Sequence, residues 1–357
     1  MLAKRIPPTA LAGATPEELA GAVLLAPVQL NRRTVRKGTS VDIDLGAELI
    51  AAAQSGGLGQ SLRIAWPDAS DLHEDEAAER LAAAAGGGGV EQRSLRQSRL
   101  DLAARWDGVL HVRTDGLTRL NTIDSLELFT LFHGQAVQAG QVVASVKVAP
   151  HLIPTALVES GVRIACEHAP LVDVRPYLAL EVAALVAETI ADSALARFEA
   201  GARTKVEALG GRFAGTTVVS IREPDAAERE ARAALESLAI ARKLPVILVG
   251  GVSAGDPLAP FYAALHSLGG RVVRHGVPAH PGSMIWLAEL GDSRLLGVPQ
   301  CGMFTMATAA DLILPRLLTG ERLTRESLAE LAHGGVLTRE MRFRFPPYAQ
   351  DLEAPEG

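Results

Sequence analysis

Cysteine and aromatic residues are scarce in this sequence. Two of its 357 residues are cysteine, Cys166 and Cys301, and phenylalanine, tryptophan and tyrosine together make up 4%. Two cysteines exclude a disulfide framework and a cysteine-based zinc site, so we expect a reducing compartment. With so few aromatic residues, the core has to be built from alanine, valine, leucine and isoleucine, which suits closely packed α/β layers.

A positive net charge and long apolar runs are also lacking. The formal charge is -6 and the pI is near 5.9, so the field of the whole chain repels phosphate backbones and we expect no nucleic-acid partner. The most apolar long segment, 178–196, contains three acidic residues, which are costly inside a bilayer. Three prolines interrupt residues 1–23, so we expect no signal peptide there. These features predict a cytoplasmic protein without a membrane partner.

The first part of the chain is expected to be an N-terminal α+β module over residues 1–152. At about 150 residues per domain, the 357 residues of the whole chain predict two to three domains. We expect two helices, from 41 to 54 and from 71 to 85, the second starting with acidic residues and ending at four consecutive glycines. Short strands are expected at 108–113, 126–132 and 142–148, and two prolines near 150–154 mark the boundary.

From residue 170 the pattern changes to alternating strands and helices. This alternation predicts a doubly wound parallel sheet over 170–320, followed by a tail over 321–357. The expected strands are 177–186, 216–221, 245–249 and 294–298, and the expected helices are 192–209, 226–242, 260–268, 304–318 and, in the tail, 325–333. The strand 245–249 is apolar throughout, which is typical of a central strand with helices on both faces of the sheet.

The loops after Val249 and Val298 are the first places to look for a site. In an open parallel sheet, ligands bind beyond the carboxyl ends of the strands. The loop after Val249 is rich in glycine and small polar residues, namely Gly250, Gly251, Ser253, Gly255 and Asp256. Glycines allow close backbone approach and the next helix can offer N–H groups to an anion, so a phosphate site and a tight structural turn are both open interpretations. The spacing matches neither a Walker A loop nor the GxGxxG fingerprint.

Two further loops carry candidate residues. The second contains Pro299, Gln300 and Cys301, where the cysteine is either a thiolate nucleophile or a small adaptable side chain. The third contains His280 followed by Pro281, Gly282 and Ser283, a turn with polar groups but without a second metal ligand at the required spacing.

Two charged segments in the N-terminal part each allow a purely structural interpretation and a functional one. The basic segment 31–38 is either a solvated turn or a groove for an anion. The acidic segment 71–76 contains His73 among carboxylates and suggests a metal site, yet a solvated helix start explains it as well. No metal ligand is assigned from the sequence.

The C-terminal half resembles the molybdopterin-binding domain shared by molybdenum insertases and related cofactor-biosynthesis proteins. The resemblance is carried by segment 249–255 after a buried strand, by Pro281-Gly282 and by 297–299 before the last helix. A subgroup of stand-alone molybdopterin-binding proteins looks similar over further segments: 71–78, 120–121, 143–147 and 334–337. The likeness therefore covers most of the chain.

The resemblance implies a fold, a ligand and a set of residues. It implies a C-terminal doubly wound α/β molybdopterin-binding domain whose loops hold the pterin and its terminal phosphate through backbone N–H groups and hydroxyls. The residues that match the family's motifs are Gly250, Gly251, Ser253, Gly255, Pro281, Gly282 and Pro299, to which we add their neighbours Ser283, Gln300 and Cys301 as candidates. It also implies a homo-oligomer, dimer or trimer, with other cofactor-biosynthesis enzymes or a molybdoenzyme as partners.

The chain departs from the family at several of these positions. Leu258 and Ala259 stand where insertases have an acidic residue and a tyrosine, Gln300 replaces a glycine, and His280 replaces an acidic residue. The leading hypothesis is a protein that binds molybdopterin or a precursor in molybdenum-cofactor biosynthesis, delivery or sensing. As an enzyme it would be a Mg²⁺-dependent transferase, by adenylyl or phosphoryl transfer or by molybdate insertion, with Asp256 as the catalytic carboxylate. The alternative is a catalytically inactive scaffold member that binds a partner protein.

Overall fold

The structure is a computed structural model that describes residues 1–30, 33–95, 99–219, 224–298 and 307–350. The chain forms two compact units. Unit 1 comprises Met1–Arg105, His111–His133 and Gly140–Val174, and unit 2 comprises Trp106–Leu110, Gly134–Ala139 and Arg175–Gly357. The chain passes between the units several times, and the predicted boundaries at 152 and 170 stay predictions.

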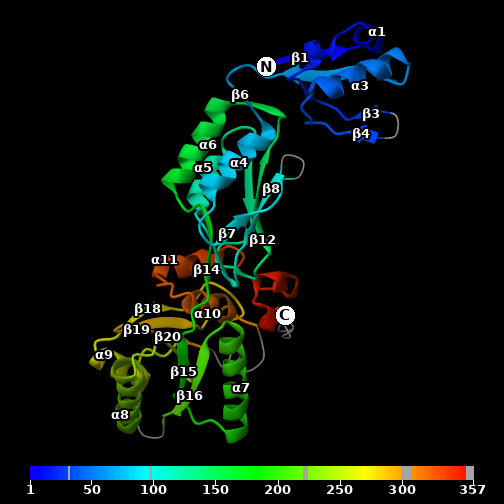
Figure 1. The fold of residues 1–357 in the computed structure, drawn as a ribbon. Coiled ribbons are helices and arrows are strands. Elements are labelled where there is room, and N and C mark those ends of the chain that lie inside the picture. Colours follow the sequence, from blue (N-terminus) through cyan, green and yellow to red (C-terminus); the bar gives the residue numbers. More distant parts are fainter. Residues whose placement is uncertain (31–32, 96–98, 220–223, 299–306, 351–357) are drawn as a thin grey trace. The chain divides into compact units, whose positions relative to one another are not determined.

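Unit 1 is a set of short strands and helices (Figure 1). Its elements are β1 (Leu2–Ile6), α1 (Pro8–Leu11), α2 (Pro16–Leu19), β2 (Val23–Leu24), β3 (Val28–Leu30), β4 (Arg33–Val35), α3 (Ile43–Gln54), β5 (Leu62–Trp66), β6 (Asp71–His73), α4 (Glu74–Ala85), β7 (Val90–Gln92), β8 (Arg99–Ala104), α5 (Thr114–Asn121), β10 (Leu126–Thr130), β12 (Val142–Val148), β13 (Leu152–Pro154) and α6 (Thr155–Glu167). The strands β9 (Gly108–Val112) and β14 (Val172–Pro176) contribute residues to both units.

Two sheets organise unit 1. One is the three-stranded sheet β1-β5-β2, and its buried side chains form one cluster with those of α3. The other is the four-stranded sheet β10-β12-β8-β7, against which α4 packs, while α6 packs on α4 (Figure 1). The predicted helix 41–54 and the predicted strands at 108, 126 and 142 are confirmed.

The predicted helix start at Asp71 is wrong by three residues. Asp71–His73 form the strand β6, which pairs antiparallel with Leu152–Pro154. The helix begins at Glu74, with the His73 side chain accepting the N–H of Asp75 as its cap. A strand partner about 80 residues away in the chain outweighs the local preference for helix, because pairing satisfies the backbone groups of both segments.

Unit 2 contains the predicted alternation of strands and helices. Its elements are β11 (Ala136–Val137), β15 (Glu181–Val186), α7 (Asp192–Ala208), β16 (Arg212–Val218), α8 (Pro224–Leu235), the π-helix η1 (Glu236–Ala241), β17 (Val246–Gly250), α9 (Pro260–Ser267), β18 (Arg271–His275), β19 (Trp286–Leu290), β20 (Ser293–Gly297), α10 (Ala310–Leu318), α11 (Arg325–Ala329), the 3-10 helices η3 (Glu330–Ala332) and η4 (Arg339–Arg344), and α12 (Pro347–Gln350). The predicted helix 304–318 lies partly outside the described residues, and its described part is α10.

The central sheet of unit 2 has six strands in the order β16-β15-β17-β20-β19-β18. Its first four strands run parallel, as predicted. The last two do not, because β19 pairs antiparallel with both β20 and β18. The expectation of a wholly parallel sheet is therefore wrong for this edge, where a hairpin joins β19 to β20 through the two residues Gly291 and Asp292. The α/β class itself is confirmed.

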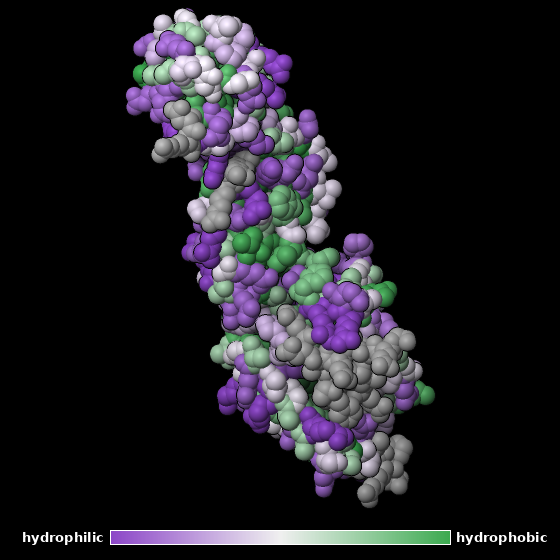
Figure 2. Space-filling view, turned by 90° about the vertical axis from the view of Figure 1, so that its right-hand side faces the viewer, coloured by the Kyte–Doolittle hydropathy of each residue, from purple (hydrophilic) through white to green (hydrophobic). Residues whose placement is uncertain are grey.

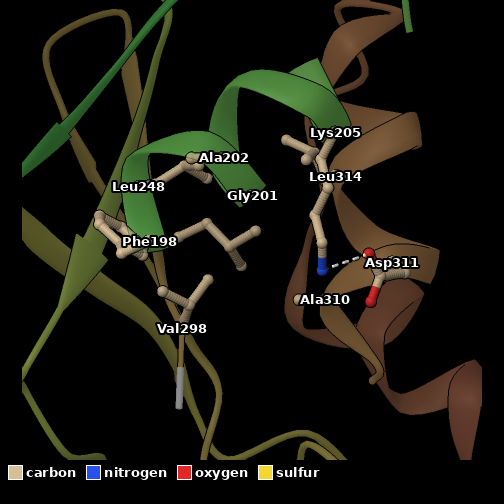
Figure 3. A pocket seen from close by; sticks show the side chains of 10 residues that line it. Phe198, Gly201, Ala202, Lys205, Leu248, Val298, Ala310, Asp311 and Leu314 are labelled. Carbon is tan, nitrogen blue, oxygen red and sulfur yellow. Dashed lines mark ion pairs between the residues drawn. The ribbon is translucent and has the colours of Figure 1, made fainter. Parts of the chain in front are cut away.

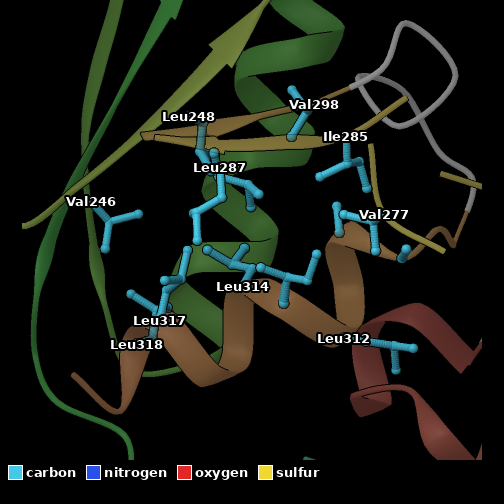
Figure 4. Packing of buried hydrophobic residues seen from close by; sticks show 14 of the residues in the cluster. Val246, Leu248, Val277, Ile285, Leu287, Val298, Leu312, Leu314, Leu317 and Leu318 are labelled. Atoms are coloured by element: carbon cyan, nitrogen blue, oxygen red, sulfur yellow. The ribbon is translucent and has the colours of Figure 1, made fainter. Parts of the chain in front are cut away.

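Helices cover both faces of this sheet. On one face, side chains of β17, β19 and β20 form a buried cluster with those of α7 and α10, drawn in part in Figure 4. On the other face, α8, η1 and α9 form a second buried cluster with the same strands. Residues after 320 join the first cluster through Leu323, Leu328 and Phe345. The two layers hold the ends of the strands, and thus the loops that follow them, in fixed positions.

The surface is mixed. On the face drawn in Figure 2, hydrophilic and hydrophobic residues are interspersed, with a group of hydrophobic ones near its middle. Several large apolar side chains of unit 1 are exposed, among them Phe129 and Phe132. Within the described ranges, no helix has the length and apolar character needed to cross a membrane.

Packing in the first cluster of unit 2 leads to a stability prediction. Leu287 is fully buried there, so Leu287→Ala leaves a cavity and should lower the free energy of unfolding by about 2–5 kcal/mol. The control Leu258→Ala removes the same atoms from a side chain that is 88% exposed, and should change it by less than about 0.5 kcal/mol. Urea unfolding monitored by circular dichroism measures the free energy of unfolding of both variants. Equal losses in the two variants would contradict the packing described.

Candidate functional site

The glycine-rich loop leaves the sheet at the carboxyl ends of its parallel strands. Val186 of β15 lies opposite Gly250 of β17, and Val249 lies opposite Gly297 of β20. The structure therefore places segment 250–256 at the sheet edge where parallel α/β sheets bind ligands. This position agrees with the one expected from the sequence.

Gly251 is required by a close approach between two loops. Its φ is +77°, and a Cβ built on it would lie 2.7 Å from the Cβ and Cγ of Glu188, which follows β15. The neighbouring Ala187 N–H donates to the Gly250 carbonyl at 2.9 Å. Glu188 was missed by the sequence reasoning, although a polar residue just after the buried run of β15 is a signal that could have found it.

Two buried aromatic side chains hold consecutive carbonyls of the loop. The Trp286 indole N–H donates to the Val252 carbonyl at 2.9 Å, and the Tyr262 hydroxyl donates to the Ser253 carbonyl at 3.2 Å. The Trp286 and Tyr262 rings pack together with 5.4 Å between centroids, and both residues are at most 2% exposed. Burial raises the pKa of Tyr262, and the negative charge of Asp256 adds to this, so the hydroxyl stays protonated and remains a donor.

These two hydrogen bonds fix the direction of the backbone N–H groups. In a trans peptide the N–H points opposite to the C=O of the same unit. With the Val252 and Ser253 carbonyls aimed at buried side chains, the N–H groups of Ser253 and Ala254 point away from them. Successive N–H groups turned to one side form a concave anion site of the kind called a nest.

The polar side chains of the loop are exposed. Ser253 Oγ accepts the N–H of Gly255 at 3.1 Å and keeps its own proton to donate. An Asp256 carboxylate oxygen accepts the N–H of Leu258 at 3.0 Å. Ser253, Gly255 and Asp256 are all exposed, so a ligand can reach them.

The loop with Pro281, Gly282 and Ser283 lies next to the glycine-rich loop. A Cβ built on Gly255 would be 3.1 Å from Met284 Cε, so the two loops are in contact. Gly282 has a φ of +114°, and a Cβ there would lie 2.8 Å from the Ala309 nitrogen, whose N–H donates to the Pro281 carbonyl at 2.9 Å. This loop therefore also packs against the start of α10.

His280 is held by a C-terminal segment. Its N–H donates to the Gly335 carbonyl at 2.7 Å, and its carbonyl accepts the Leu337 N–H at 2.8 Å. Segment 334–337, noted in the sequence, thus lies beside the Pro-Gly loop, while the His280 side chain is exposed.

The second predicted loop stays a prediction, because Pro299, Gln300 and Cys301 lie outside the described residues. Val298, which precedes them, donates its N–H to the Val249 carbonyl at 2.8 Å. The chain therefore enters this loop directly beside the start of the glycine-rich loop.

A buried ion pair lies beneath this sheet edge. The Lys205 ammonium of α7 lies 2.8 Å from an Asp311 carboxylate oxygen of α10. Figure 3 draws this ion pair. Both residues line a cavity of about 20 Å³ together with Leu248 and Val298. The other carboxylate oxygen of Asp311 accepts the Thr308 N–H at 2.9 Å. Burial raises the pKa of the nearby Tyr348, and the Asp311 charge raises it further. No local pattern in the sequence indicates this pair, since its members are 106 residues apart.

The charged segments of the N-terminal part lie elsewhere, in unit 1. Arg36 and Lys37 line a cavity of about 350 Å³ together with His73 and Asp75. The buried Glu74 carboxylate pairs with His151 at 3.0 Å. Among the residues that the structure describes, no three metal-ligating side chains are grouped to hold an ion.

The chain was compared with known proteins. No protein-family model matches the sequence, and no curated protein matches it. Among solved structures, the molybdopterin biosynthesis MoeA protein from Pyrococcus horikoshii is similar, with 13% identity over 70% of this chain and 79% of that chain and a TM-score of 0.28. The molybdopterin biosynthesis enzyme MoaB from Thermus thermophilus has 17% identity over 40% of this chain and 98% of that chain, also with a TM-score of 0.28. These TM-scores are too low for either likeness to assign a family or a function to this chain.

The buried ion pair leads to a second stability prediction. Asp311→Asn leaves the Lys205 ammonium without its buried counter-charge and should lower the free energy of unfolding by about 3–5 kcal/mol. The double variant Lys205→Met with Asp311→Leu removes both charges and should recover part of this loss. Urea unfolding of the unaltered chain, of Asp311→Asn and of the double variant tests this prediction. An Asp311→Asn protein as stable as the unaltered chain would show that the ion pair does not contribute to stability.

Proposed function

We propose that this protein binds molybdopterin or a molybdenum-cofactor precursor and acts in the biosynthesis, delivery or sensing of that cofactor. The binding site is the sheet edge formed by the glycine-rich loop and the Pro-Gly loop, completed by Pro299, Gln300 and Cys301. Molybdopterin carries a terminal phosphate, and an anion is the group that such an edge accepts best. The sequence resemblance described above supports the choice of ligand.

The observation that carries the proposal is the pair of aromatic hydrogen bonds beneath the loop. They hold the N–H groups of Ser253 and Ala254 on the side away from Trp286 and Tyr262, next to the exposed Ser253 hydroxyl. Two backbone donors and one hydroxyl donor are a suitable set for a phosphate. Gly251 keeps the loop in this conformation, because a side chain there would collide with Glu188.

Asp256 is the proposed catalytic residue if the protein is also a transferase. It is one exposed carboxylate beside the loop, and Mg²⁺ is commonly held by one or two carboxylates together with substrate phosphates and water. The described residues do not form a Mg²⁺ site by themselves, so no catalytic step is assigned to the ion. A cytoplasmic homo-oligomer, dimer or trimer, with cofactor-biosynthesis enzymes or a molybdoenzyme as partners, belongs to the same proposal.

The first test of this proposal measures binding. Calorimetric titration of the full chain with molybdopterin, its adenylylated form and the mature cofactor should give a dissociation constant of about 1 μM or below for at least one of them. Tyr262→Phe removes only the hydroxyl that holds the Ser253 carbonyl, and should weaken this binding about fivefold. Ser253→Ala removes a donor to a charged group, and should weaken it about tenfold or more.

The matched control is Tyr177→Phe, which removes the hydroxyl of a half-buried tyrosine that precedes β15. It should leave the affinity unchanged. If Tyr177→Phe and Tyr262→Phe weaken binding equally, the orienting role of Tyr262 is wrong.

A separate prediction concerns turnover. If the protein transfers phosphoryl or adenylyl groups, Asp256→Asn should abolish turnover and leave the dissociation constant within about twofold, because the amide keeps the size of the side chain but not its charge. Steady-state rates and titrations on the same protein preparation measure both. Unchanged turnover would remove Asp256 from the mechanism.

The second candidate is a scaffold that has lost catalysis and binds a partner protein. The observation that favours it is Leu258, which is 88% exposed at the loop where the family has an acidic residue. Leucine has neither the charge that could hold Mg²⁺ nor a hydrogen-bonding group for a phosphate, so this position lacks the chemistry that the family has there. Absence of binding for all three forms of the ligand would favour this candidate over the first.

A further inference from the structure

A second cavity of unit 2 lies toward the opposite edge of the central sheet. It has a volume of about 570 Å³ and is lined by residues of β18, β19 and β20 and by the segment 322–326. Arg294 is the second residue of β20, whereas the glycine-rich loop follows the last residue of the neighbouring parallel strand β17. The cavity is therefore separate from the site proposed above, and nothing in that proposal uses it.

Three charged residues form a row across the strands at this edge. Arg271 of β18 lies opposite Glu289 of β19, which lies opposite Arg294 of β20. Arg271 Nε is 2.5 Å from one Glu289 carboxylate oxygen, and an Arg294 guanidinium nitrogen is 3.2 Å from the other. One carboxylate is thus shared between two guanidinium groups, which leaves an excess of positive charge.

Arg294 is a buried cation. It is 6% exposed, and burial lowers its pKa, with the charges of Arg322 and Arg271 acting in the same direction and those of Glu289 and Asp292 opposing them. A buried guanidinium is costly unless counter-charges and hydrogen bonds compensate for the lost water. Glu289, shared with Arg271, is only a partial compensation.

Two more arginines come from the chain after α10. Arg322 and Arg325 line the cavity, and Arg322 pairs with Asp292 at 3.0 Å. The Asp292 side chain is 99% exposed, and exposed ion pairs contribute little, so a ligand can replace this partner. Arg274 donates to the Arg325 carbonyl at 3.3 Å and thereby ties this segment to β18. Together, four arginines and two glutamates, Glu289 and Glu326, line the cavity.

The uncharged part of the lining consists of Val272, Val273, Leu323 and Thr324. Val273 and Leu323 are buried members of the first hydrophobic cluster and form one wall. The volume lies in the range of small-molecule sites, and it exceeds what an inorganic ion fills. A ligand that uses both parts of the cavity has an anionic group and an organic body.

We propose that this cavity binds a small organic phosphate monoester, with Arg294, Arg322 and Arg325 around the phosphate and Val273 and Leu323 against its organic part. Guanidinium groups match phosphate oxygens with paired N–H donors. Once the ligand displaces the exposed Asp292 from Arg322, the four arginines exceed Glu289 and Glu326 by two positive charges, which a phosphate dianion balances. A single carboxylate would leave one of these charges uncompensated.

The experiment is a calorimetric titration of the full chain with phenyl phosphate, which joins a phosphate dianion to an apolar ring. We expect saturable binding that is weakened at least tenfold in the double variant Arg322→Ala with Arg325→Ala. Both arginines are exposed, so this variant should keep the fold, which circular dichroism checks. Inorganic phosphate, which lacks the organic part, should bind more weakly than phenyl phosphate.

The matched control is Arg232→Ala, which removes an exposed arginine of α8 that pairs with Glu236. It should bind phenyl phosphate as the unaltered chain does. Ser253→Ala separates this inference from the proposed function, since it should weaken molybdopterin binding and leave the arginine-dependent binding of phenyl phosphate unchanged. No saturable binding, or binding that the double arginine variant leaves intact, would overturn the inference.

Discussion

Trp286 and Tyr262 donate hydrogen bonds to the consecutive carbonyls of Val252 and Ser253, and the rest of the candidate site depends on these two contacts. They set the plane of two peptide units, and through that plane the direction of the N–H groups that face a ligand. The donors are buried in the layer formed with α9, so the core positions the loop in addition to the loop's own turn residues. In a chain with 4% aromatic residues, two of the few large rings are used for this purpose.

The Pro-Gly loop is fixed from the opposite face of the sheet. The Pro281 carbonyl accepts the N–H of Ala309 just before α10, and α10 is in turn fixed by the pair between Asp311 and Lys205 of α7. The two loops therefore depend on different helical layers and meet where Gly255 approaches Met284. The position of each loop is therefore sensitive to changes in the helical layer that holds it.

Charge is distributed unevenly in a chain whose net charge is -6. Unit 2 gathers arginines around the cavity beside β18 and β19, and the proposed phosphate site at the other edge uses backbone dipoles and a hydroxyl. Backbone donors provide a partial positive potential without the desolvation cost of a buried ion, whereas Arg294 carries that cost and needs counter-charges. The two proposed sites thus differ in the physical means by which they would attract an anion.

The sequence by itself determined the local elements of this protein. The apolar run of β17, the glycines that end α7 and α9, and the alternation in β12 were sufficient to place the bounds of those elements within one residue, because each signal arises from residues close together in the chain. The glycine-rich loop could be located for the same reason. Only the tertiary structure decided the rest: that β19 runs antiparallel to β20, that Asp71–His73 form a strand, that Trp286 lies under a loop 34 residues earlier, and that Arg271, Glu289 and Arg294 form one row. These features are pairings between distant segments, and local periodicity carries no information about which distant backbone satisfies a strand or which distant charge shares a carboxylate.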